Sequence, residues 1–224
     1  ICARTKADIE ATAAGIAAKY GVSVTGLACD VTTEEGRKAV LAACPNPDIL
    51  VTNAAGPPAG DFRNFTLDDW RKAAEGNFFA PIALIQATIY GMMERGFGRI
   101  INITSASVKA PIPMLELSNG VRAGLTGAVA TLARTASRSN VTINNLLPGQ
   151  HETDRLDSII ANNMKKSGND KDVVIKDMKA KIPAGRFGTS EEFGAACAFL
   201  CSRQAGFITG QNLVLDGGAY PGTL

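Results

Sequence analysis

Several polar side chains between residues 105 and 151 could move protons or hold charge. Ser105 follows a β-branched apolar run, and Ser118 comes thirteen residues later, near the start of an expected helix. Arg122 stands four residues after Ser118, so both side chains lie on one face of that helix. His151 is the only histidine of the chain, and histidine is the residue type most often used for proton transfer in catalysis. These residue types suit acid–base chemistry beside a fixed positive charge.

Each of these residues also has a purely structural explanation. Ser118 can be an ordinary residue near a helix N-terminus, and His151 can be a partly exposed loop residue. Glu116, a further proton donor to consider, can be a first-turn carboxylate that the helix dipole stabilises. Asn77 lies in the middle of an expected helical stretch, where its amide competes for backbone hydrogen bonds. Its presence there needs a reason.

Small and polar residues follow several of the expected strands, where a ligand can approach the backbone closely. In dinucleotide-binding domains an arginine after the second strand accommodates a 2′-phosphate, whereas an acid binds the ribose 2′-hydroxyl. Arg4 therefore favours NADP(H) over NAD(H), unless it is a solvated first-turn residue.

Alternating strands and helices must position these residues. Strands are expected at 22–29, 49–52, 99–104, 141–147 and 212–215, and helices at 6–20, 33–43, 67–95, 117–138 and 190–202. The alternation predicts an α/β fold, a doubly wound parallel sheet of the Rossmann type with helices on both faces. We expect helix 67–95 to be interrupted around Gly76 and Pro81. Two short amphipathic helices are expected within 153–182, a charged insertion that we interpret as a substrate lid.

The chain opens on ICAR, which suggests the end of a strand that leads into a helix. A nucleotide-binding α/β domain needs a strand, a glycine-rich turn and a helix before that point, a unit of roughly 30 residues. We therefore expect residues 1–224 to be a single, N-terminally incomplete NAD(P)-binding domain. Its first strand and glycine-rich turn are absent from this sequence.

The composition argues against several classes of partner. The 224 residues carry a formal net charge of +2, and 46% are hydrophobic. Without a basic stripe, nucleic-acid binding has no support, and no apolar run has the length of a membrane span. Five cysteines without a CxxC pair, and a single histidine, argue against a metal site and favour the reducing cytoplasm.

Taken in order, the motifs resemble those of the short-chain dehydrogenase/reductase family, in particular its 3-oxoacyl-[acyl-carrier-protein] reductases. The resemblance covers essentially the whole chain and runs from Asp30 through Asn53–Gly56 and Pro148–Thr153 to Asp216–Gly218. It implies an NADP(H)-dependent oxidoreductase, in which hydride passes between the nicotinamide and the carbonyl carbon of a small molecule or acyl thioester. It also implies that Ser105 fixes the carbonyl and that Asn77 kinks its helix. Together with Arg4, the residues that the resemblance implies for cofactor binding are Asp30, Val31, Asn53, Ala54, Ala55, Gly56, Arg122, Pro148, Gly149 and Thr153.

The family's catalytic tyrosine and lysine are replaced here by Ser118 and Arg122, and the chain contains no YxxxK motif. Serine is a far weaker acid than a phenol, so we expect an atypical proton donor, with Ser118, Glu116 and His151 as the alternatives. A second reading is a catalytically silent family member that binds a nucleotide or a partner as a sensor or scaffold. The retained Ser105 and the cofactor motifs favour the enzyme.

The resemblance further implies a homotetramer or homodimer. In the family, the helices that contain Asn77 and Ser118 pack against their copies across a two-fold axis. Apolar residues remain available there in this chain: Phe78, Phe79, Ile82, Ile85, Leu125, Val129 and Leu132.

Overall fold

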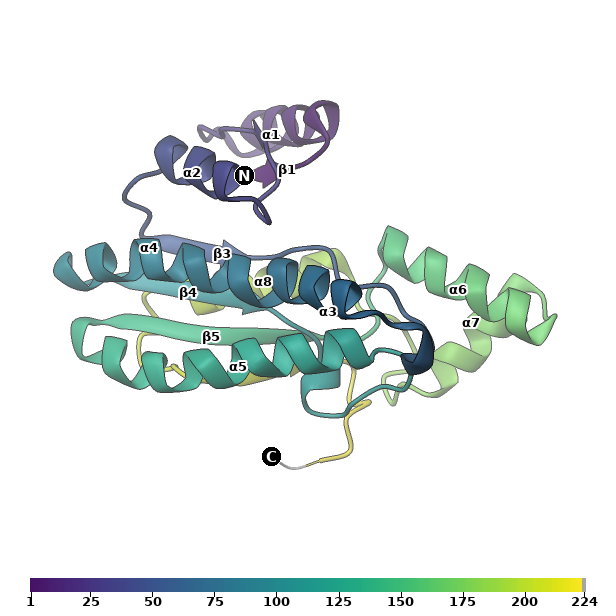
Figure 1. Cartoon of the computed structure of the whole chain (residues 1–224). Helices are drawn as coiled ribbons and strands as arrows, with labels where there is room; N and C mark the ends of the chain where they lie inside the picture. Colours follow the sequence, from purple (N-terminus) through teal and green to yellow (C-terminus); the bar gives the residue numbers. More distant parts are fainter. Residues whose placement is uncertain (223–224) are drawn as a thin grey trace.

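The computed structural model describes residues 1–222 and has the predicted α/β architecture with parallel sheets (Figure 1). Its strands are β1 (Cys2–Ala3), β2 (Leu27–Ala28), β3 (Ile49–Thr52), β4 (Gly98–Ile103), β5 (Val141–Pro148) and β6 (Asn212–Leu215). Its α-helices are α1 (Lys6–Tyr20), α2 (Glu34–Ala43), α3 (Leu67–Ala74), α4 (Ala80–Glu94), α5 (Glu116–Ala136), α6 (Asp154–Ser167), α7 (Lys171–Ala180) and α8 (Ser190–Cys201).

The strands form two parallel sheets. β3, β4, β5 and β6 lie side by side in that order, and β1 pairs with β2 alone. Helices α4 and α5 cover one face of the larger sheet and α8 covers the other (Figure 1). Because all strands of a parallel sheet run the same way, their carboxyl ends meet at one edge, where ligands bind in such folds.

The expected strand at 22–29 is wrong for most of its length, since only Leu27 and Ala28 are extended in a ladder. Their partners are Cys2 and Ala3. A strand is defined by its hydrogen-bonded partner, so the apolar pattern of residues 22–26 was not enough to form one.

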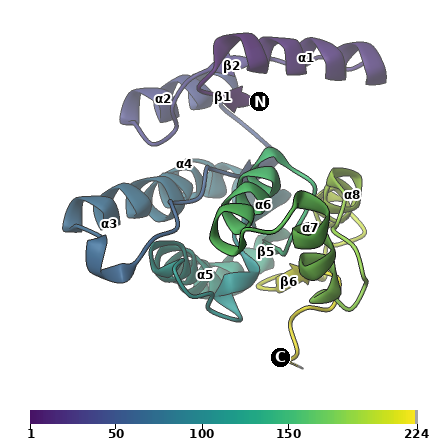
Figure 2. The same ribbon diagram turned by 90° about the vertical axis from the view of Figure 1, so that its right-hand side faces the viewer.

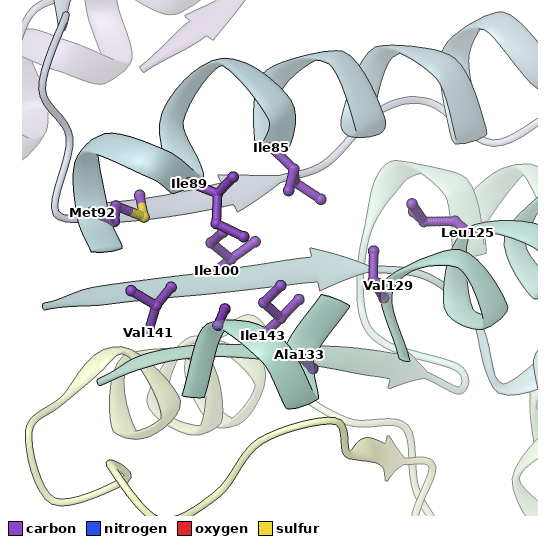
Figure 3. Packing of buried hydrophobic residues seen from close by; sticks show 10 residues of the cluster. Ile85, Ile89, Met92, Ile100, Leu125, Val129, Ala133, Val141 and Ile143 are labelled. Carbon is purple, nitrogen blue, oxygen red and sulfur yellow. The ribbon is translucent and has the colours of Figure 1, made fainter. Parts of the chain in front are cut away.

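The core between the larger sheet and α4 and α5 is aliphatic (Figure 3). α4 contributes Ile85, Ile89 and Met92, and the strands contribute residues such as Ile100 and Ile143, all at most 2% exposed. Burial of each such side chain stabilises the fold by roughly 1.5–3 kcal/mol. This layer holds the helix that carries Ser118 and Arg122 rigidly against the sheet.

A ladder of polar side chains crosses the larger sheet. Thr52 Oγ1 donates to Asn102 Oδ1 at 2.7 Å, and Asn102 Nδ2 donates to Asn145 Oδ1 at 3.0 Å. Asn145 Nδ2 in turn donates to Asn212 Oδ1 at 2.8 Å. Each of these residues faces the next in the strand register. Satisfied buried amides favour one register, so the ladder fixes how the strand ends line up beneath the site.

The long helical stretch is interrupted as predicted, by a π-helical turn at Glu75–Phe79 between α3 and α4. Pro81 causes no second break, because it lies in the first turn of α4, where a missing N–H is tolerated. The expected helices within 153–182 are α6 and α7, which Figure 2 shows in front of the carboxyl end of the larger sheet. Within residues 1–222, no helix has both the length and the apolar character needed to cross a membrane.

Candidate active site

Helix α5 brings Ser118 and Arg122 to the carboxyl end of β4. Both side chains lie on its buried face, with exposed fractions of 6% and 8%. The helix packs against the short 3₁₀ turn Ala106–Val108 that follows Ser105. Arg122 thus lies at the end of β4, which Ser105 follows, and Ser118 lies one helical turn earlier on the same buried face of α5.

The guanidinium of Arg122 is fixed by the end of β4. Its Nη1 donates to the carbonyl oxygens of Ile103 at 2.8 Å and Thr104 at 2.9 Å. Within residues 1–222 its Nε and Nη2 donate to no acceptor, so they remain free for a ligand. Burial, and to a lesser degree the charge of Arg155, lower the pKa of Arg122 to about 10. The side chain therefore stays positively charged at neutral pH.

Ser105 caps the turn that follows β4. Its Oγ accepts a hydrogen bond from the backbone N–H of Ser107 at 3.1 Å. That bond uses a lone pair and leaves the hydroxyl proton free to donate. The hydroxyl can therefore hold a carbonyl oxygen, the role that the sequence predicts for it.

Asn77 connects the π-helical turn to the Asn53–Gly56 segment. Its Nδ2 donates to Ala55 O at 3.2 Å and to Ala73 O at 3.4 Å, and the side chain is 5% exposed. A π-helical turn often marks a functional site, and here it allows an amide in a helix to reach a neighbouring loop. The hydrogen bond to Ala55 O therefore explains why an asparagine lies in the middle of this helical stretch.

Arg4 and Asp30 lie near each other at the ends of the paired strands β1 and β2. The Asp30 carboxylate accepts hydrogen bonds from the N–H and the hydroxyl of Thr32 at 2.9 and 2.8 Å. These bonds, and then the charge of Arg4, lower the pKa of Asp30. Arg37 Nη1 donates to Val31 O at 3.0 Å and holds the turn in place. Arg4 itself is exposed and forms no ion pair within residues 1–222.

The Pro148–Thr153 turn is built by close backbone approach. Gly149 N–H donates to Leu215 O at 2.8 Å, and a Cβ at Gly149 would lie 2.6 Å from the Cβ of Asp216. Thr153 is the N-cap residue of α6, and its hydroxyl donates to His151 O at 3.3 Å. The turn therefore needs glycine at 149, and it fixes where α6 begins.

The His151 ring lies against Phe193 in an edge-on arrangement, with 5.2 Å between the ring centroids. A Cβ on Gly188 would approach the ring to 2.6 Å, so any larger residue at position 188 would displace the ring. Nδ1 of His151 lies 3.5 Å from the carbonyl oxygen of Gly149. None of these contacts joins His151 to Ser105 or Ser118. They indicate that the ring packs the start of α8 onto the turn.

Two acid–base candidates differ in their surroundings. Glu116 Oε1 accepts from Met114 N–H at 3.1 Å, while its Oε2 is buried and has no hydrogen-bond partner within residues 1–222. Ser118 Oγ forms no hydrogen bond within that range.

Arg155, which lies beside Gly56 together with Arg122, is not among the site residues predicted from the sequence. No local pattern in the sequence marks Arg155, because Gly56 and Arg122 are distant from it along the chain.

Comparisons with known proteins give a consistent result. A family model described as "Enoyl-(Acyl carrier protein) reductase" matches residues 1–220. The "NADPH-dependent reductase BacG" of Bacillus subtilis is 31% identical over 224 residues, which is 98% of this chain and 86% of the relative. The "3-oxoacyl-[acyl-carrier-protein] reductase FabG" of Vibrio cholerae is 34% identical over 201 residues, 87% of this chain and 77% of the relative. The crystal structure of YwfH, an "NADPH dependent reductase involved in Bacilysin biosynthesis", has a TM-score of 0.93 at 30% identity and covers 99% of this chain and 88% of that one.

Proposed function

This chain belongs to the short-chain dehydrogenase/reductase family, and on that premise we propose that it is an NADP(H)-dependent oxidoreductase that interconverts a carbonyl and a hydroxyl group. One observation carries the proposal. The end of β4 holds the buried, charged Arg122 with two N–H-bearing nitrogens free, beside the Asn53–Gly56 segment that Asn77 fixes. The relatives are reductases that use NADPH or act on 3-oxoacyl groups, so the silent sensor or scaffold is not favoured.

The residues present fit NADP(H). Arg4, exposed and without an ion pair in the described chain, would bind the 2′-phosphate, and Asp30 and Val31 would bind the adenine. Arg122 would donate through its free N–H groups to the nicotinamide ribose, and Thr153 would face the nicotinamide. When bound, the cofactor supplies the hydride.

The protein's own part in the chemistry is to orient the carbonyl and to provide a proton. Ser105 would donate its free hydroxyl hydrogen to the carbonyl oxygen. Ser118, whose hydroxyl forms no bond within residues 1–222, is the proposed atypical proton donor. Because serine is a weak acid, this step would be slow, and the charge of Arg122 would help by stabilising negative charge on the oxygen.

Two experiments test the proposal. Titration with NADPH or NADH, followed by cofactor fluorescence, measures binding. NADPH absorbance, followed after addition of ketones or 3-oxoacyl thioesters, measures turnover. We expect tighter binding of NADPH than of NADH, and slow oxidation of NADPH that depends on the carbonyl compound. A chain that binds neither cofactor contradicts the proposal.

We expect His151 to act through packing, so a His151→Asn variant should keep turnover within about tenfold of the original and retain its pH profile. A general acid contributes about two to four orders of magnitude. If turnover instead falls by that factor at the pH optimum, with folding unchanged by circular dichroism, then His151 donates the proton.

We propose that α6 and α7 form the lid over the substrate site. They share a small apolar cluster separate from the main core, formed by Leu156, Ile160, Val174, Met178, Ile182 and Phe187. Elements with little burial against the main core open at low free energy. Hydrogen exchange of residues 153–182 should slow when NADP(H) binds, and equal exchange rates with and without cofactor would contradict the lid.

We also propose that the protein is a cytoplasmic homotetramer or homodimer. Three residues expected at the interface, Ile85, Leu125 and Val129, are buried in this chain's own core instead. Phe79, 51% exposed on the same helical layer, remains available. Light scattering at micromolar concentration should report a dimer or larger, and a monomer would contradict this expectation.

A further inference from the structure

A hollow of about 340 Å³ lies at the amino end of the larger sheet, at the opposite end of its strands from α6 and α7 (Figure 1). The turns that lead into β4 and β5 line it, together with a residue that follows α8. A cavity of this size can hold a small molecule. Its lining residues are Arg95, Gly96, Phe97, Arg99, Asn140 and Arg203.

Arg99 is the buried member of this lining, with 1% of its surface exposed. Its Nε donates to Ser202 O at 3.0 Å, and its Nη1 donates to Gly98 O at 2.8 Å and Asn140 O at 2.9 Å. Nη2 has only a long contact, 3.5 Å, with Asn140 Oδ1. A Cβ on Gly206 would lie 3.3 Å from Nη2, so the glycine leaves space there. The guanidinium is therefore fixed on one side and has N–H groups left for a ligand on the other.

The charge around the hollow is positive and largely unpaired. Arg203 is exposed, forms no hydrogen bond or ion pair through its side chain within residues 1–222, and lies over the Phe97 ring. Within the same residues, the only carboxylate less than 4 Å from these arginines is that of Asp48, 3.3 Å from Arg95. Burial is the main cause that lowers the pKa of Arg99, and the charge of Arg203 adds to it. Close like charges are unfavourable, so an anion in the hollow would stabilise them.

Two buried hydroxyl groups next to Arg99 have no hydrogen-bond partner within residues 1–222. Thr142, whose Oγ1 is one of them, pairs with Arg99 in the β4–β5 register and is 1% exposed. Ser202 Oγ is the other, and it belongs to the residue whose carbonyl oxygen accepts from Arg99 Nε. Buried polar groups are rarely left without a partner. The chain alone therefore does not satisfy the polar groups around Arg99.

We propose that this hollow binds a phosphate group, either free phosphate or a phosphomonoester, at a site separate from the carbonyl and cofactor sites. Guanidiniums match phosphate oxygens in bidentate geometry. Arg95, Arg99 and Arg203 come from three segments: the end of α4, the start of β4 and the chain after α8. They can meet a tetrahedral oxyanion from several sides, whereas a planar carboxylate needs only one guanidinium. The site is independent of the proposed reductase function.

Titration calorimetry with inorganic phosphate, in a chloride buffer without other oxyanions, tests this site. We expect saturable binding that Arg203→Ala weakens at least about tenfold, because charge-assisted hydrogen bonds are strong. The exposed Arg203 side chain forms no hydrogen bond within residues 1–222, so this variant should keep its melting temperature. A parallel titration uses phenyl phosphate. Tighter binding of phenyl phosphate identifies a phosphomonoester as the ligand, and tighter binding of inorganic phosphate identifies free phosphate.

Two variants serve as controls. Arg134→Ala removes the same charge from an exposed position on α5, and Arg4→Ala removes it from the candidate cofactor site. Both should leave the phosphate affinity unchanged. Three results overturn the proposal: no saturable binding of either phosphate compound, equal effects of Arg203→Ala and Arg134→Ala, or a larger loss of affinity in Arg4→Ala than in Arg203→Ala. The third would mean that the phosphate binds in the cofactor site.

Discussion

Replacing Ser118 with tyrosine and Arg122 with lysine is expected to raise turnover of simple ketones and 3-oxoacyl thioesters by about two to four orders of magnitude, the usual contribution of a general acid. A phenol is a far stronger acid than the Ser118 hydroxyl, and it reaches further from the helix. A lysine at 122 keeps the positive charge and lowers the phenol's pKa. Steady-state NADPH oxidation measures the change.

The segment at the end of α5 offers a matched control. Ser137→Tyr with Arg134→Lys makes the same two replacements at exposed positions beyond and near the end of α5, and should leave turnover as it was. If the Ser118/Arg122 variant folds and binds NADPH but turns over no faster than the original, the site lacks more than the phenol, and the carbonyl-reductase account fails.

The second large effect concerns the cofactor. Arg4→Ala is expected to weaken NADPH binding by about 10- to 100-fold, since a hydrogen bond between charged groups contributes roughly 1.5–3 kcal/mol. NADH, which has no 2′-phosphate, should bind almost as before. Fluorescence titration of both cofactors measures the ratio.

Lys6→Ala is the control for that experiment. It removes the same charge two residues away, from a side chain that is 75% exposed and pairs with Glu10. Two results would show that Arg4 does not bind the 2′-phosphate. One is equal affinity of the original chain for NADPH and NADH. The other is an Arg4→Ala variant whose affinity falls by the same factor for both cofactors.

Most of the fold was predictable because the signals are local. Apolar spacing identified α1 and β3 with their observed bounds, and the mid-helix Asn77 marked the turn that interrupts the helix. The failure at residues 22–26 has a non-local cause, since a strand needs a hydrogen-bonded partner that the local pattern does not reveal. The Thr52–Asn212 ladder was equally hidden, because its members meet only in the assembled sheet.

The site was partly predictable for the same reason. Ser105, Ser118 and Arg122 follow a motif at fixed spacing, so they could be named from the sequence. Arg155 could not, because its meaning depends on Gly56, nearly a hundred positions earlier. His151 was singled out as the lone histidine, but the direction of its ring toward Phe193 is a packing outcome that composition does not reveal.

Hydride transfer from NADPH to a carbonyl compound leaves a trace that can be followed atom by atom. The most direct measurement uses NADPH deuterated on the transferred face of C4, incubated with the chain and a panel of ketones and oxo acids, with products analysed by mass spectrometry. We expect a hydroxyl product that carries one deuterium on the former carbonyl carbon. The opposite result is that both the original chain and the Ser118→Tyr, Arg122→Lys variant bind NADPH but form no deuterated product. In that case the chain is not a carbonyl reductase.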